Sequence, residues 1–86
     1  MPKAVIDSIK RRAASIVLAR MGKEMAQVMQ SHLQRSYGIS LTEGDPSIFS
    51  FDQLHFGLSV LLGEGNANIL LQQITKEIVG LSEQAN

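Results

Sequence analysis

Apolar residues recur at steps of three and four along most of this chain, which is the spacing of one face of an α-helix. Near the N-terminus this pattern predicts a helix over 3–20. Its apolar face consists of Val5, Ile6, Ile9, Ala13, Ile16 and Val17. On its opposite, polar side lie Lys3, Asp7, Lys10 and Arg11. Arg20 falls on the apolar side of the last turn, where the helix dipole favours a cation and the side-chain stem can cover apolar surface.

A second helix is predicted over 23–37, because polar and apolar positions separate there at a period of 3.6 residues. Gly38 is expected to end it as a left-handed C-cap, with Ile39 folding back onto the last turn. Three methionines recur every four residues in this region. Such stripes can form adaptable binding grooves but more often belong to a core, which is the interpretation favoured here. They are Met21, Met25 and Met29.

The second half of the chain predicts two further helices. Asp45-Pro46 is a helix start and predicts a short helical turn over 46–49. Ser50, with Gln53 three residues later, has the spacing of a capping box and predicts a helix over 51–62. A fourth helix is expected over 66–79, ended by Gly80, with 81–86 as a frayed tail. No period-two alternation is present, so we predict an all-α protein.

Two segments 41 residues apart, which begin at Met21-Gly22 and Leu62-Gly63, follow the same pattern. In each, Ala follows Gly after three variable residues, and an apolar residue stands further on. The matching pairs are Gly22 and Gly63, Ala26 and Ala67, and Leu33 and Ile74. This weak repeat predicts two helical hairpins built alike. We therefore expect one four-helix domain over 1–86, made of two Gly-pivoted helical hairpins.

The predicted helix over 51–62 is apolar nearly all round, which is typical of a helix buried on most sides. Only three other helices are available to cover it in a domain of this size. It is therefore expected to be either the central element or part of a subunit interface. For the interface, the candidate residues are Phe51, Phe56 and Leu58. A homo-oligomer or a protein partner is the binding partner that this pattern favours.

Charge is balanced overall but unevenly placed. Residues 1–42 carry seven basic and two acidic side chains, for a net charge of +5, whereas residues 43–86 carry one basic and six acidic, for −5. One interpretation is that the two halves attract each other in the folded domain. The alternative is a nucleic-acid-binding face on the first helix, formed by Lys3, Lys10 and Arg11.

The turn Leu62-Gly63-Glu64-Gly65 invites comparison with the helix-hairpin-helix DNA-binding module, which also places two glycines between short helices. That module has an apolar residue between its glycines, whereas this chain has Glu64. A carboxylate in the turn would repel a phosphate approaching the backbone N–H groups. The turn therefore argues against this module.

No arrangement typical of an enzyme is found. No nucleophile elbow, phosphate loop or zinc-protease pattern is present. His55 follows Asp52 by three residues, and His32 borders an apolar face; both are expected to be structural, although a small-ligand or metal role stays open at either. We therefore predict no catalytic residue, metal, cofactor or small-molecule substrate.

The cellular setting is indicated only indirectly. The chain has no cysteine, which fits a reducing compartment. Its apolar runs are far shorter than the roughly 20 residues that span a bilayer, and no signal peptide is expected. These features predict a cytoplasmic protein with no membrane association.

Several positions, taken in order, are similar to a known family. They are Met21-Gly22, Leu33, Tyr37-Gly38-Ile39, Pro46, Phe49, Leu58 and Leu62-Gly63-Glu64-Gly65. Over most of residues 15–80 the chain resembles a family of small archaeal helical domains, sometimes called the Nitrosopumilus output domain. The resemblance implies four short helices in a domain that occurs alone or behind receiver and sensor modules, and it implies no catalytic residues. The chain departs from the family in a longer Pro46–Gly63 segment and in having Asn66 where the family usually has Ala.

The function most consistent with these features is a small, non-enzymatic regulatory or protein-interaction module. It would act as an output domain in signal transduction and would self-associate as a dimer through the apolar helix over 51–62.

Overall fold

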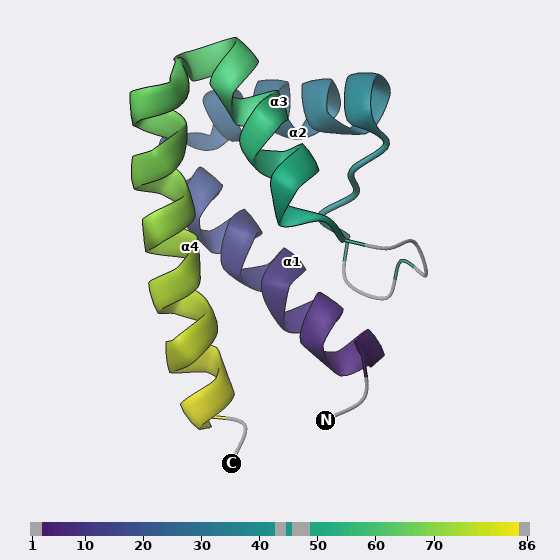
Figure 1. Cartoon of the computed structure of the whole chain (residues 1–86), viewed down its shortest axis with the longest axis vertical. Helices are drawn as coiled ribbons and strands as arrows, with labels where there is room; N and C mark the ends of the chain where they lie inside the picture. The colour runs from purple at the N-terminus through teal and green to yellow at the C-terminus, as the bar shows by residue number, and fades with distance from the viewer. Residues whose placement is uncertain (1–2, 43–44, 46–48, 85–86) are drawn as a thin grey trace.

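Four α-helices follow one another in the computed structural model, which describes residues 3–42, 45 and 49–84 and the side chains of 7–42, 45 and 49–83. In chain order the helices are α1 (Lys3–Ala19), α2 (Lys23–Tyr37), α3 (Phe51–Leu62) and α4 (Glu64–Gln84) (Figure 1). The described residues contain no strand. The predicted all-α, four-helix fold is confirmed.

The two glycine joints share one backbone conformation. Gly22, between α1 and α2, has φ 104° and ψ 149°, and Gly63, between α3 and α4, has φ 90° and ψ 154°. Each glycine carbonyl accepts the first hydrogen bond of the following helix, from the N–H of Ala26 at 2.9 Å and of Ala67 at 3.0 Å. Both alanines are buried. The repeat found in the sequence is therefore a repeat of structure.

Backbone strain at the joint can be measured with two glycines that lie two residues apart. A Cβ at Gly63 or at Gly65 would meet no atom within 4 Å, but only Gly63 has a positive φ. We expect Gly63→Ala to lower the free energy of unfolding by about 1–3 kcal/mol, because side-chain-bearing residues rarely adopt this region. Gly65→Ala should instead raise it by up to about 0.5–1 kcal/mol. Urea denaturation followed by circular dichroism tests this; equal effects at the two sites would contradict it.

The helices pack in a cycle around one core. α1 contacts α2 and α4, and α3 contacts the same two helices. In Figure 1, α4 runs along the length of the molecule beside α1, and α2 crosses behind α3 in the upper half. The side chains with the least exposure come from all four helices. They are Ala13, Ala14, Val17, Leu18, Met29, Leu33, Leu54, Leu58, Ala67 and Ile74.

α2 and α3 cross at Gly57. A Cβ built on this residue would lie 2.6 Å from Leu33 Cδ2 and 3.1 Å from the Tyr37 ring. Leu33 is itself fully buried, so it has little space into which to move. The missing side chain is what allows the two helices to approach so closely.

Gly57→Ala is expected to lower the free energy of unfolding by up to about 2 kcal/mol, because overpacking outweighs the better helix propensity of alanine. The matched control is Gly80→Ala, also within a helix but with no atom within 4 Å of the added Cβ. That substitution should raise stability by about 1 kcal/mol. Thermal or urea unfolding measures both, and a stabilised Gly57→Ala protein would show that the crossing is not tight.

Gly38 caps the end of α2 as predicted, and Ser50 supplies the serine half of the predicted capping box. Gly38 is left-handed, with φ 65°. The N–H of Ile39 donates to the Leu33 carbonyl at 3.1 Å, and the Ile39 side chain is buried against the end of α2. At the start of α3, the Ser50 hydroxyl accepts a hydrogen bond from the N–H of Gln53 at 3.3 Å.

The predicted end of the fourth helix is wrong. α4 begins at Glu64 and continues through Gly80 to Gln84, so 81–84 belong to the helix and are not a frayed tail. Ile78 and Leu81 stand three residues apart and pack against the core. Their burial outweighs the roughly 1 kcal/mol that glycine costs inside a helix. The predicted helical turn over 46–49 falls largely outside the described residues.

One side of α1 also differs from its prediction. Asp7 and Arg11 were expected on a polar, outward face, but both are buried. Arg11 is buried because the segment after α2 lies against this side of α1 and accepts hydrogen bonds from the guanidinium.

Candidate functional site

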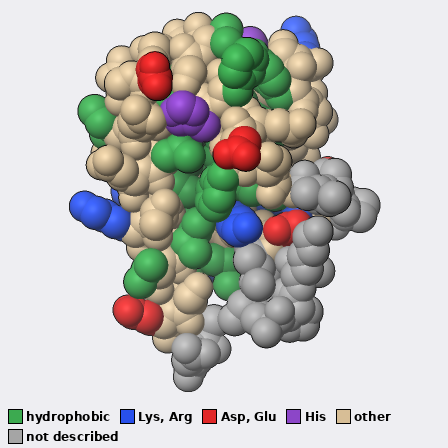
Figure 2. Space-filling view, viewed as in Figure 1, with side chains coloured by type: hydrophobic (Ala, Val, Ile, Leu, Met, Phe, Trp, Pro, Cys, Tyr) green, Lys and Arg blue, Asp and Glu red, His purple; other side chains and the backbone are tan. Residues whose placement is uncertain are grey.

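α3 is covered on one side only. Leu54, Gly57 and Leu58 are buried, whereas Phe56 and Val60 are each 59% exposed. Within one copy of the chain α3 is therefore not a central helix buried on most sides, and the alternative of a subunit interface stays a prediction. Figure 2 shows one group of hydrophobic side chains near the top of the molecule, where α3 lies in Figure 1, and a separate run of them through its centre.

The three candidate interface residues occupy different positions. Phe56 is exposed, as an interface residue must be. Leu58 has no exposed surface and belongs to the core, so it cannot contact a partner. Phe51 is half-buried: its ring packs edge-on against Phe49 at 5.5 Å, and the Lys10 ammonium lies 5.2 Å from its centroid.

An aromatic chain connects α3 with α2. The rings of Tyr37 and Phe56 meet edge to face at 5.6 Å, and the rings of His32 and Tyr37 meet the same way at 5.5 Å. His32 follows Val28 and Met25 along one side of α2, at four- and three-residue steps that keep the three in line. We call the surface formed by Met25, Val28, His32, Phe56 and Val60 the α2–α3 surface.

The methionine stripe is only partly core. Met29 is buried beside Leu33, but Met21 and Met25 are exposed. The core face of α2 is formed by Ala26, Met29 and Leu33, and this turns the other two methionines away from it. Sequence reasoning also missed Val28 and Val60 as surface residues. The available signals were that Glu24, Ser31 and His32 lie one helical turn from Val28, and that Val60 follows Phe56 by one turn.

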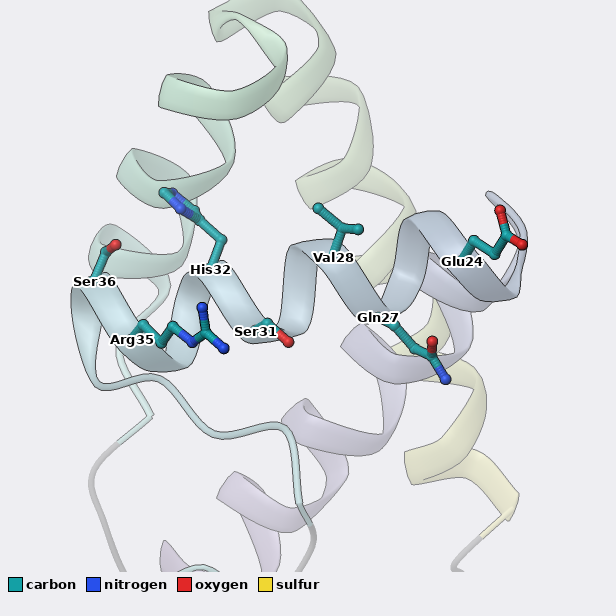
Figure 3. Close-up of a pocket in the computed structure, with 7 residues that line it drawn as sticks. All are labelled: Glu24, Gln27, Val28, Ser31, His32, Arg35 and Ser36. Carbon is teal, nitrogen blue, oxygen red and sulfur yellow. The ribbon is translucent and has the colours of Figure 1, made fainter.

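An open depression runs along the outer side of α2. It is lined by Glu24, Gln27, Val28, Ser31, His32, Arg35 and Ser36. Figure 3 shows these side chains along one helix, with Glu24 near one end and Arg35 near the other. The lining is mostly polar, and only Val28 is aliphatic. Such a shallow, one-sided hollow suits contact with another helix better than the enclosure of a small molecule.

The two histidines lie in different environments, one in a contact between helices and one with a buried ring nitrogen. His55 Nε2 lies 2.6 Å from Asn68 Oδ1 and so links α3 to α4, whereas the sequence suggested Asp52 as its neighbour. His32 Nε2 is buried and has no hydrogen-bond partner among the described residues. The described part of the chain holds no group of three or more His, Cys, Asp or Glu side chains that could bind a metal ion.

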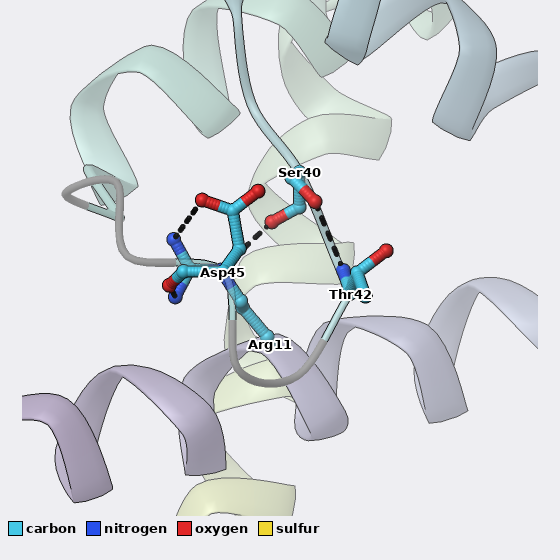
Figure 4. Close-up of polar contacts among 4 residues, drawn as sticks. All are labelled: Arg11, Ser40, Thr42 and Asp45. Carbon is cyan, nitrogen blue, oxygen red and sulfur yellow. Dashed lines mark hydrogen bonds and ion pairs between the residues drawn. The ribbon is translucent and has the colours of Figure 1, made fainter.

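Arg11 fastens the segment after α2 to α1 (Figure 4). Its side chain donates from Nε to the Ser40 carbonyl and from Nη1 to the Asp45 carbonyl, each at 2.9 Å. Its Nη2 lies 4.0 Å from Asp45 Oδ1, and its guanidinium lies 5.6 Å from the buried Phe49 ring. The residue is only 2% exposed.

This geometry removes Arg11 from the candidate nucleic-acid face, because a buried guanidinium cannot reach a phosphate. Lys10 is half-buried with its ammonium near Phe51, and the side chain of Lys3 lies outside what the structure describes. The alternative of nucleic-acid binding thus loses one of its three residues.

The opposite charges of the two halves of the chain meet in the fold. Arg20 at the end of α1 forms an ion pair with Glu77 of α4, and Arg11 lies near Asp45. Both contacts join a cation of the first half to a carboxylate of the second. They support the interpretation that the halves attract each other.

Arg11→Lys should lower the free energy of unfolding by about 2–4 kcal/mol, because one ammonium cannot reproduce the forked geometry that reaches two carbonyls. Its neighbour Arg12 is exposed, so Arg12→Lys is the matched control and should change stability by less than about 0.5 kcal/mol. Chemical denaturation of both variants measures the difference. Similar values for the two would contradict the anchoring role.

Comparisons of this chain with protein-family models, curated proteins and solved structures gave no match. The resemblance to the archaeal output domains therefore stays a prediction. Within the described residues, none of the helices combines the length and apolar character required to cross a bilayer.

Proposed function

We propose that this protein is a small, non-enzymatic regulatory module that acts by binding protein, and that it associates with a second copy of itself through the α2–α3 surface. The observation that carries the proposal is the exposure of Phe56 and Val60 on α3 and of Met25 and Val28 on α2, together with the contact of Phe56 with Tyr37 of α2. Scattered single apolar residues on a surface need no explanation, but a connected group often marks a protein contact.

The size of the surface indicates a weak dimer. Complete burial of a large apolar side chain contributes about 1.5–3 kcal/mol, and the residues of the α2–α3 surface are already partly covered. Two copies of the surface must together outweigh an association cost of roughly 4–15 kcal/mol. The gain and the cost are of similar size, so we expect a weak dimer with a dissociation constant in the micromolar range.

The regulatory role rests on two further considerations. The Nitrosopumilus output domains that the chain resembles occur alone or behind receiver and sensor modules, and behind such a module a change in association can transmit a signal. In addition, three polar contacts among the described residues serve the fold: Arg11 fastens a loop, Arg20 pairs with Glu77, and His55 links two helices.

Val60→Ser should abolish or strongly weaken the dimer while the helical content stays unchanged, because it replaces an exposed apolar contact by a polar one. Val79→Ser is the matched control, since Val79 is 53% exposed on α4, away from the α2–α3 surface. Sedimentation velocity at micromolar concentrations measures association, and circular dichroism measures the fold. A wild-type protein that remains monomeric throughout would contradict the proposal, as would equal weakening by both substitutions.

A further inference from the structure

We infer that the second copy binds with its α2 antiparallel to α2 of the first, about a two-fold axis near the middle of the helix. This inference rests on the proposed self-association. In this arrangement Glu24 faces Arg35 of the partner subunit, Gln27 faces the partner's His32, and Val28 faces the partner's Ser31. A two-fold axis makes each of these contacts occur twice.

The charges on the outer side of α2 favour this orientation. Glu24 lies in the first turn of the helix and Arg35 in the last. About three turns separate them, so both point to the same side, and both line the depression in Figure 3. Parallel pairing in register would set each charge against its own copy. Antiparallel pairing sets each carboxylate against a guanidinium.

The exposed apolar residues favour the same orientation. Met21 lies just before α2 and Met25 in its first turn, whereas Phe56 packs on Tyr37 at the end of the helix. Antiparallel pairing brings the partner's Met25 close to Tyr37 and Phe56, so that the apolar groups at opposite ends of each helix cover each other. Thioether and aromatic side chains pack favourably together. Parallel pairing would place the methionines next to each other and leave Phe56 without this contact.

The middle of the depression suits a helix crossing. Val28 and Ser31, which lie nearest the axis, are small, and helices in contact approach to about 8–10 Å according to their side chains. Gln27, the next residue outward, is exposed and can hydrogen-bond to the second copy.

Single cysteines test the orientation, because the chain has no cysteine of its own. In a dimer of Glu24→Cys alone or Arg35→Cys alone, the two thiols lie on opposite sides of the axis, about 16 Å apart along the helix. A disulfide requires a Cβ–Cβ separation of about 4 Å. In an equimolar mixture the two cysteines face each other, and the other Glu24–Arg35 pair remains intact. We expect mild oxidation to give a disulfide between the two variants in the mixture and little disulfide in either variant alone.

The matched control mixes Glu24→Cys with Gln34→Cys, whose side chain is also exposed but lies about a quarter turn round α2. This mixture should give little disulfide. Efficient cross-linking of Glu24→Cys with itself, or equal cross-linking in the control, would overturn the antiparallel arrangement.

Charge reversal separates this inference from the proposed function. Glu24→Arg or Arg35→Glu alone should raise the dissociation constant by roughly threefold to tenfold at low salt, and high salt should reduce the effect. The double variant Glu24→Arg/Arg35→Glu should restore the wild-type value. If the single reversals change nothing while Val60→Ser still dissociates the dimer, the inference is wrong and the proposed function stands. A wild-type monomer overturns both.

Discussion

The structure depends on one backbone conformation that is used twice, at Gly22 and Gly63. Both joints have positive φ and extended ψ, so the chain changes direction within one to three residues and each following helix begins at the residue after the glycine. The two hairpins then close into a cycle in which α3 crosses α2 at Gly57. This crossing covers Leu58 and turns Phe56 outward. The proposed interaction surface is thus a consequence of where the glycines stand.

Much of the fold could be predicted because its signals are local. The bounds of α2 and α3, the left-handed Gly38 and the Ser50 cap each depend on residues within one helical turn. The repeat around Gly22 and Gly63 could also be predicted, since the same conformation requires the same residue in both places. The end of α4 was mispredicted because it depends on tertiary contacts. Glycine locally favours the end of a helix, but the packing of Ile78 and Leu81 against the core continues α4 through Gly80.

The candidate site was less predictable, because exposure is decided by tertiary contacts. A helix that is apolar nearly all round gives no sign of which side its neighbours cover, so Leu58 and Phe56 looked alike in the sequence but lie in the core and on the surface. From its place in the helical pattern, Arg11 was expected on the surface. Its partners are the carbonyls of Ser40 and Asp45, which are distant in the sequence, and helical periodicity carries no information about such contacts. The sequence contains few signals of catalytic or metal-binding residues. Among the described residues, no group of three or more His, Cys, Asp or Glu side chains could hold a metal ion.

Two-dimensional NMR of methyl groups over a series of protein concentrations tests the central claim, self-association through the α2–α3 surface, most directly. If the copies associate through this surface, the methyl signals of Met25, Val28 and Val60 shift together as concentration rises through the micromolar range. The signals of Ile69 and Val79, which are exposed on α4, should stay in place. Signals that do not shift at any concentration, or shifts centred on Ile69 and Val79, would contradict the account.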